Sequence, residues 1–197
     1  MYPNVGNTNP SEGDFVANAS NVISFIFEWL EVIAQTIIFV VFVFTFVCRL
    51  MTVKGNSMLN TLHNADKVFA WRYNYVPTNG DVVVIRKYGQ LTESIVKRVI
   101  ATQGQQFHID FASGSVYVNG KKLDEYYIKE PMTTYGDQVI PSVIPQGKCF
   151  VMGDNRNGST DSRWSLVGLV DYKDVVGKVC YIYFPFYRMG TVARAVQ

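Results

Sequence analysis

The chain has 197 residues and a formal net charge of +2 at pH 7, and it contains two histidines and three cysteines. So small a charge, without an arginine-rich run, argues against a nucleic-acid-binding protein. The histidines and cysteines show no metal-ligand spacing, so we expect neither a metal site nor a cofactor. The length leaves room for one domain of ordinary size beside a membrane segment.

Two segments of different composition precede the larger part of the chain. Residues 1–21 are rich in Asn, Ser, Gly and Pro, which predicts a disordered tail. Residues 22–51 are predicted to form a membrane anchor with its lead-in, because residues 32–48 are an uncharged apolar run without a polar face. A signal peptide is a poorer interpretation, since the run has no basic segment before it and no Ala-x-Ala-like exit.

The charges around this anchor favour one orientation. No Lys or Arg precedes the apolar run, whereas Arg49, Lys54, Lys67 and Arg72 follow it. The positive-inside rule, taken alone, therefore places the C-terminal part of the chain in the cytoplasm.

The remaining residues, 52–197, have the pattern of a mostly β domain. Short runs of β-branched and aromatic residues predict strands over residues 67–71, 82–85, 93–100, 106–109, 149–152 and 175–183. Asn119-Gly120 predicts a hairpin turn within residues 115–123. Residues 124–147 lack periodicity and contain several prolines, which predicts a long extended surface segment. Cys149 and Cys180 are expected to be small buried hydrophobes, although spacing leaves a disulfide between them open.

The polar turn Gly55-Asn56-Ser57 follows the apolar run closely and presents a hydroxyl near the bilayer. A serine hydroxyl is a poor nucleophile until a base removes its proton. Lys97 is the candidate base, because strand side chains alternate and one of Lys97 and Arg98 must face inward. Burial lowers a lysine pKa and leaves an amine that accepts a proton. On pattern alone, a solvated edge strand is an equally good interpretation of this pair.

A dense polar loop, residues 153–163, follows the strand predicted over residues 149–152. Asp154 or Asp161 can pair with Arg156 or Arg163, and such pairing would fix the shape of the loop. A serine of this loop is placed to orient a neutral lysine amine. A solvated loop would explain any three of these residues, but not the whole run.

Together these segments resemble the type I signal peptidases, membrane-anchored endopeptidases that remove signal peptides with a Ser/Lys pair. Residues 57–62, Ser-Met-Leu-Asn-Thr-Leu, are similar to the family's nucleophile motif Ser-Met-x-Pro-Thr, and residues 80–84 to its Gly-Asp-(Ile/Val)-Val strand. Residues 97–100 are similar to its lysine motif, and residues 176–190 to its C-terminal strand and tail. Residues 153–163 match its Gly-Asp-Asn-Arg-x-x-Ser-x-Asp-Ser-Arg motif at every fixed position.

The resemblance implies a mostly β, signal-peptidase-like catalytic domain behind one N-terminal transmembrane helix. It implies that Ser57 attacks the scissile carbonyl, that Lys97 is general base and then general acid, and that the backbone N–H of Ser57 holds the oxyanion. Ser159 would orient the lysine amine. The residues implied to brace the site are Asp154, Arg156, Asp161 and Arg163. The residues implied to wall the pockets for small substrate side chains are Met58, Leu62, Ile95 and Val96.

The implied substrates are preproteins whose signal peptides end in Ala-x-Ala-like sequences, bound extended against the strand of Lys97. The lipid bilayer is the second expected partner, and we expect a monomer. The family implies a single-pass protein of the plasma membrane whose catalytic domain faces away from the cytoplasm. We follow this orientation over the one that the flanking charges favour.

The sequence departs from the family pattern in two motifs: Asn60 replaces the proline of the nucleophile motif, and residues 101–105 replace Gly-x-Pro-Gly-Asp. These two changes motivate an alternative, a catalytically inactive paralogue that binds preproteins. Gly55 stands where some members carry a hydroxyl, so a single oxyanion donor is expected. The membrane run and the lack of a DNA-binding segment argue against a third candidate, a self-cleaving Ser/Lys regulator. A triad built on His63 has no obvious carboxylate to orient it.

Overall fold

The structure is a computed structural model that describes residues 12–87 and 93–195. It divides into two compact units, with the division between Val43 and Phe44. Each unit is described by itself, starting with the N-terminal helix.

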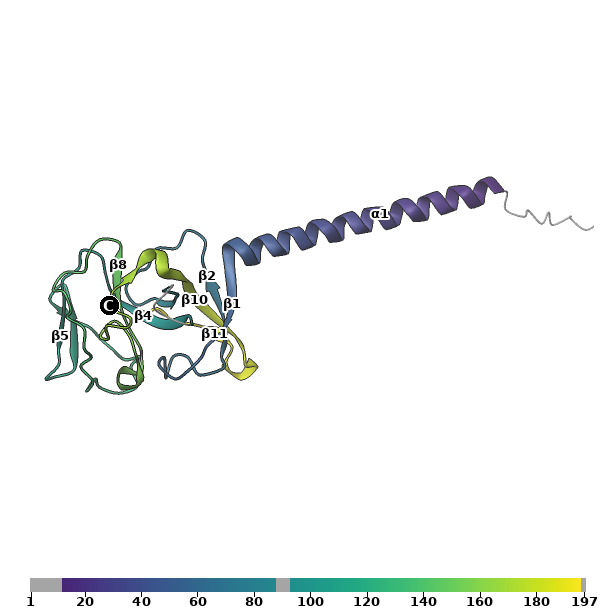
Figure 1. The fold of residues 1–197 in the computed structure, drawn as a ribbon. Helices are drawn as coiled ribbons and strands as arrows, with labels where there is room; N and C mark the ends of the chain where they lie inside the picture. Colours follow the sequence, from purple (N-terminus) through teal and green to yellow (C-terminus); the bar gives the residue numbers. More distant parts are fainter. Residues whose placement is uncertain (1–11, 88–92, 196–197) are drawn as a thin grey trace, which may run out of the picture. The chain divides into compact units, whose positions relative to one another are not determined.

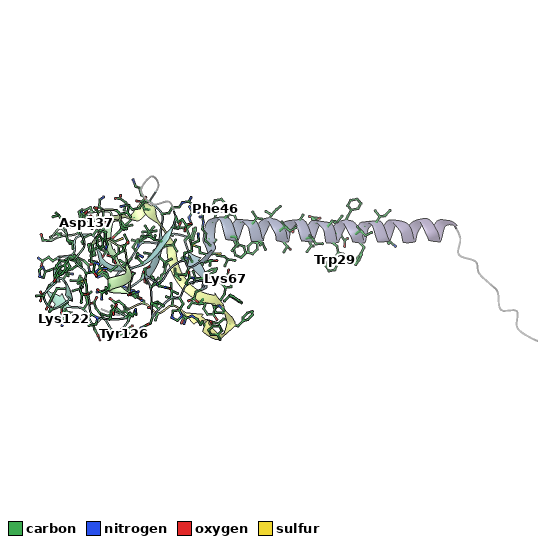
Figure 2. The ribbon with its side chains drawn as sticks, turned by 60° about the horizontal axis from the view of Figure 1, so that its bottom comes forward. Trp29, Phe46, Lys67, Lys122, Tyr126 and Asp137 are labelled. Atoms are coloured by element: carbon green, nitrogen blue, oxygen red, sulfur yellow. The ribbon has the colours of Figure 1, made fainter. Side chains whose placement is uncertain are left out.

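The first unit is a single long helix, α1, which spans Glu12–Phe42 and continues into a short π-helical segment, Val43–Val47 (Figure 1). Its 25-residue stretch Ile23–Val47 is long and apolar enough to cross a membrane. Figure 2 shows side chains, Trp29 among them, standing out around this helix. The helix agrees with the predicted anchor.

Both ends of the anchor differ from the prediction. α1 begins at Glu12, so residues 12–21 are helical where a disordered tail was expected; residues 1–11 lie outside the described part. The alanines Ala17 and Ala19 have high helix propensity, which the polar composition of this stretch obscures. At the other end, residues 48–51 belong to strand β1, Cys48–Thr52, because a partner strand is available to satisfy their backbone.

The second unit is built on an eight-stranded antiparallel sheet with the order β1-β2-β10-β3-β4-β8-β9, and β11 pairs with β10. Its strands after β1 are β2 Lys67–Trp71, β3 Val82–Ile85, β4 Ile95–Thr102, β8 Lys148–Met152, β9 Val170–Asp171, β10 Val175–Phe184 and β11 Gly190–Thr191. The predicted strands are confirmed with shifts of at most two residues at their ends. The short strands β9 and β11 were not predicted.

A smaller three-stranded sheet contains β5 Phe107–Asp110, β6 Ser115–Val118 and β7 Lys121–Lys122. Asn119 and Gly120 join β6 to β7 with φ angles of 51° and 77°, as the predicted hairpin turn requires. Short 3₁₀ turns lie at Arg156–Gly158, Tyr172–Asp174 and Phe186–Arg188.

Residues 124–147 contain no named strand but are not wholly at the surface. Tyr127, Met132 and Ile144 are buried, and the last two pack in the apolar cluster of β5, β6 and β8. The expected surface segment is therefore partly a core element, because Met132 and Ile144 pack in the cluster that includes the smaller sheet. Cys149 and Cys180 carry free thiols; Cys149 is buried as expected, whereas Cys180 is only half-buried, contrary to expectation.

Strand β4 positions the site, since it lies between β3 and β8 in the large sheet. Apolar clusters pack on its two faces: Val96 contacts the cluster that includes Met58 and Leu62, and Ile95 contacts the cluster that includes Val83 and Val151. Figure 1 shows β4 in the middle of the domain. Side chains at the N-terminal half of β4 are therefore held between packed layers.

Candidate active site

Ser57 lies in a loop, residues 53–66, whose two ends are joined. Val53 N–H donates to the carbonyl of Asp66, and Ala65 N–H donates to the carbonyl of Val53. Gly55 N–H donates to Oδ1 of Asn64 at 2.9 Å. Gly55 has a φ of +82°, a conformation that glycine adopts without strain. The loop is thus closed at its base and turns sharply two residues before Ser57.

Lys97 reaches this serine from β4. Its Nζ lies 2.7 Å from Oγ of Ser57. Lys97 is paired with Val83 of β3, and only 3% of the residue is exposed. Its neighbour Arg98, on the opposite face of the strand, is also buried, at 1% exposed. The prediction that one of the two faces inward is confirmed, and the solvated edge-strand interpretation is wrong for both.

Burial changes the acid–base chemistry of Lys97. Loss of hydration lowers its pKa from 10.5 to about 8, the nearby Asp161 and Asp154 oppose this change, and Arg163 adds to it. A substantial fraction of the amine is therefore neutral at mildly alkaline pH. A neutral amine at hydrogen-bond distance from a hydroxyl is able to take its proton.

Arg98, on the other face of β4, helps to fix the nucleophile loop, residues 53–66. Its Nε and Nη2 lie 2.9 and 2.7 Å from the two carboxylate oxygens of Asp154. Thr61 of the nucleophile loop donates its hydroxyl to Asp154 and accepts from Arg98 Nη2 at 3.1 Å. The ring of Tyr127 covers the guanidinium, with its centroid 4.3 Å from Cζ. Asp154 thus braces Ser57 through Thr61.

The rest of the polar loop is fixed by further buried ion pairs. Arg163 Nε and Nη2 lie 2.8 and 2.9 Å from the two oxygens of Asp161. Asp161 also accepts the N–H of Gly153 at 3.0 Å. Arg156 donates to Glu125 and to the Gly153 carbonyl. The predicted Asp–Arg pairing within the loop is present for Asp161 and Arg163 only. Asp154 pairs instead with Arg98 of β4, and Arg156 pairs with Glu125, outside the matched motifs.

Asn155 is a contributor that the sequence analysis did not single out. Its backbone N–H donates to the Ser57 carbonyl at 3.0 Å, and its Nδ2 donates to the Asn56 carbonyl at 3.1 Å. These bonds hold the peptide groups on both sides of Ser57. The sequence contained one indication of this role, because Asn155 occupies a fixed position of the motif at residues 153–163.

Ser159 is buried beside the nucleophile but has no recorded contact with the lysine amine. Within the described residues its Oγ makes no hydrogen bond. A Cβ added to Gly153 would lie 2.3 Å from this Oγ and 2.4 Å from the Ser57 carbonyl oxygen, which places both atoms around Gly153. The orienting role of Ser159 stays a prediction.

The residues expected to wall the substrate pockets do not form one surface. Met58 and Leu62 are 1% and 0% exposed and belong to the apolar core, so their role as pocket walls stays a prediction. Their four-residue spacing brings them together on one turn, where the N–H of Leu62 donates to the carbonyl of Met58. Ile95 and Val96 are half-buried on opposite faces of β4, and only Ile95 shares the face of Lys97.

A free strand edge lies beside the serine and the lysine. β3 pairs with β4 over residues 95–98, whereas the pairing of β8 with β4 begins at Arg98. In the described part of the chain, residues 95–97 thus have no partner strand on the β8 side. An unpaired edge of this kind accepts an extended peptide.

A metal site and a triad built on His63 have less support than a contact between Ser57 and Lys97. No group of three His, Cys, Asp or Glu side chains that could hold a metal occurs among residues 12–87 and 93–195. In the same residues, His63 forms hydrogen bonds through its backbone: its N–H donates to Oδ2 of Asp66, and its carbonyl accepts the N–H of Asp66. Ser57 is paired with Lys97 instead.

A β domain in which a serine hydroxyl lies 2.7 Å from a buried lysine amine has a nucleophile and a base in contact, an arrangement typical of serine hydrolases. The model of the signal peptidase, peptidase S26 family matches residues 26–184. The chain belongs to this family.

Individual relatives agree with this assignment. Signal peptidase I of Bacillus licheniformis is 34% identical over 171 residues, which cover 82% of this chain and 90% of the relative. Signal peptidase IB of Staphylococcus aureus (strain COL) is 34% identical over 179 residues, which cover 82% and 91%. A crystal structure of a signal peptidase I from Enterococcus faecalis V583 is 25% identical, covers 53% of this chain and 97% of that one, and has a TM-score of 0.43.

Proposed function

We propose that the protein is an active signal peptidase I that cleaves preproteins after small, Ala-x-Ala-like residues, with Ser57 as nucleophile and Lys97 as general base. The observation that carries the proposal is the 2.7 Å contact between Lys97 Nζ and Ser57 Oγ at a buried position. Asn60 and residues 101–105, which depart from the family pattern, leave this contact in place. We therefore favour cleavage over an inactive paralogue that only binds preproteins.

The proposed reaction begins when neutral Lys97 takes the proton of the Ser57 hydroxyl. Oγ attacks the scissile carbonyl, and Lys97 then gives the proton to the leaving amine, so that an acyl-enzyme remains. Water, activated by the same amine, releases the acyl group. The Ser57 N–H makes no hydrogen bond in the described part of the chain and is available to the oxyanion. Gly55 supplies no second hydroxyl donor.

We propose that the substrate lies extended along the free edge of residues 95–97. Backbone hydrogen bonds to this edge would hold the peptide, and Ile95, half-buried on the face of Lys97, would contact a small side chain. The proposed preference for small residues at the cleavage site rests on membership of the signal peptidase family.

We further propose that α1 anchors the protein in the plasma membrane as a single-pass protein whose catalytic domain faces away from the cytoplasm. The apolar stretch Ile23–Val47 supports the anchor. The orientation follows from the reaction, because the cleavage site of an exported preprotein emerges on that face. We propose that the protein acts there as a monomer, without a cofactor.

Cleavage of a preprotein with an Ala-x-Ala site by the detergent-solubilised full chain tests the proposed function. Because Lys97 must be neutral to act, kcat/KM should rise about tenfold per pH unit at low pH and level off above about pH 8. The Ser57→Ala variant should give no product at any pH. A folded unsubstituted protein that leaves several such preproteins intact, or a profile flat from acid to alkaline pH, would contradict the proposal.

A further inference from the structure

Arg188 connects the C-terminal hairpin to the loop that carries Ser57. It ends the 3₁₀ turn Phe186–Arg188, which lies between β10 and β11. Its Nε lies 3.1 Å from Oδ1 of Asp66, and its Nη2 lies 3.2 Å from Oδ2. Nη2 also donates to the Thr61 carbonyl at 3.5 Å. One side chain thus contacts two positions of the nucleophile loop.

Asp66 connects Arg188 to other residues of the nucleophile loop. The residue is 1% exposed, and its Oδ2 also accepts the N–H of His63 at 2.8 Å. The carbonyl of Asp66 accepts the N–H of Val53, which closes the base of the loop. A buried carboxylate that loses its cation is costly, so the loop must rearrange or hydrate when Arg188 is removed.

Arg188 acts on a different side of the loop from the two anchors described above. Asn155 holds the carbonyls of Asn56 and Ser57, and Asp154 holds the Thr61 hydroxyl. These anchors come from the motif at residues 153–163. Arg188 holds the Thr61 carbonyl and Asp66, and it comes from the far C-terminal part of the chain.

We propose that Arg188 is a positioning residue, which acts through Asp66 and Thr61 to hold Ser57 in reach of Lys97. The inference rests on the proposed function. A displacement of a reacting group by about 1 Å costs about 10² in rate. Because the anchors from the motif remain, loss of Arg188 alone should cost about tenfold in kcat.

A merely structural ion pair would behave differently. Because Asp66 is buried, removal of Arg188 would then lower the melting temperature and leave kcat unchanged in the folded protein. The free edge at residues 95–97 does not contact Arg188 in the described residues, so KM should not follow a change in kcat.

Three variants of the full chain in detergent separate these cases: Arg188→Gln, Arg188→Lys and Arg194→Gln. Lysine keeps the charge but cannot reproduce two parallel contacts, so it should restore part of the lost rate. Arg194 is the matched control, because it is an arginine of the same C-terminal segment whose Nε donates to the Asn79 carbonyl at 2.8 Å, outside the nucleophile loop. Each variant is measured by preprotein cleavage and by hydrogen exchange of the peptide that covers residues 53–66.

For Arg188→Gln we expect kcat about tenfold lower, KM within about twofold, and faster exchange in residues 53–66. Arg188→Lys should fall between this variant and the unsubstituted protein, and Arg194→Gln should match the latter. Unchanged exchange and unchanged kcat in folded Arg188→Gln, or an equal loss in Arg194→Gln, would overturn the inference. If the unsubstituted protein cleaves nothing, the proposed function fails, and the exchange of residues 53–66 still decides whether Arg188 holds the loop.

Discussion

Replacing Lys97 by methionine should abolish cleavage while leaving the fold intact. Methionine has a similar length and no titratable group, so it fills the buried space between β3 and the Ser57 loop without accepting a proton. Loss of the base should lower kcat/KM by about 10⁴-fold or more. Lys122→Met, on the exposed strand β7, is the control and should cleave normally.

The same substitution should stabilise the folded domain at neutral pH. The pKa of Lys97 falls from 10.5 to about 8 on folding, a difference that corresponds to about 3 kcal/mol at pH values where both states are protonated. Between about pH 8 and 10.5 the unfolded chain binds the extra proton, so the stability of the unsubstituted protein rises with pH in this window. The advantage of methionine should therefore shrink across it.

Chemical denaturation at about pH 7 and at about pH 10 measures the difference in the free energy of unfolding between Lys97→Met and the unsubstituted protein. We expect Lys97→Met to be more stable than the unsubstituted protein at the lower pH, by about 1–3 kcal/mol after loss of the hydrogen bond to Ser57. A variant that is less stable at both values, or one that still cleaves at a comparable rate, would show that Lys97 is not a buried base.

Replacing Gly153 by alanine should lower kcat by about 10²-fold. The new Cβ would lie 2.4 Å from the Ser57 carbonyl oxygen and 2.3 Å from Ser159 Oγ, closer than unbonded atoms approach. The Ser57 backbone must then move, and it cannot do so without weakening the bond from Asn155 N–H. The hydroxyl would leave its position beside Lys97.

Steady-state cleavage by Gly153→Ala, with Gly190→Ala as control, measures this effect. A Cβ at Gly190 meets no atom within 4 Å, so that variant should keep its activity. Circular dichroism verifies that both variants fold. If folded Gly153→Ala cleaved within about twofold of the unsubstituted protein, the packing of residues 153–159 against Ser57 would not govern the reaction.

Local pattern was sufficient to predict most strands, but on pattern alone a solvated Lys97 was as good an interpretation as a buried one, and the pairing of Ser57 with Lys97 was implied by the resemblance to the family. Alternation along residues 95–100 placed one basic residue inward, but pattern cannot reveal that Arg98 on the other face has a buried partner in Asp154. That partner is distant in sequence. Asn155 is also distant in sequence from its partner, because its Nδ2 donates to the carbonyl of Asn56.

One error arose because apolar residues look alike in a sequence. Residues 48–51 continue the hydrophobicity of the anchor, yet they pair with β2. The deciding contact is tertiary, so propensity does not contain it. Motif position likewise could not show that Met58 and Leu62 pack in the apolar core.

Covalent labelling of Ser57 tests the central claim most directly. The folded protein and its Lys97→Met variant are incubated with an inhibitor that acylates serine nucleophiles, digested, and examined by mass spectrometry for the peptide that contains Ser57. Since the hydroxyl reacts only when a base accepts its proton, we expect an adduct on Ser57 in the unsubstituted protein and none in the variant. No adduct on Ser57 in the folded protein, or equal labelling of the variant, would contradict a Ser57/Lys97 dyad.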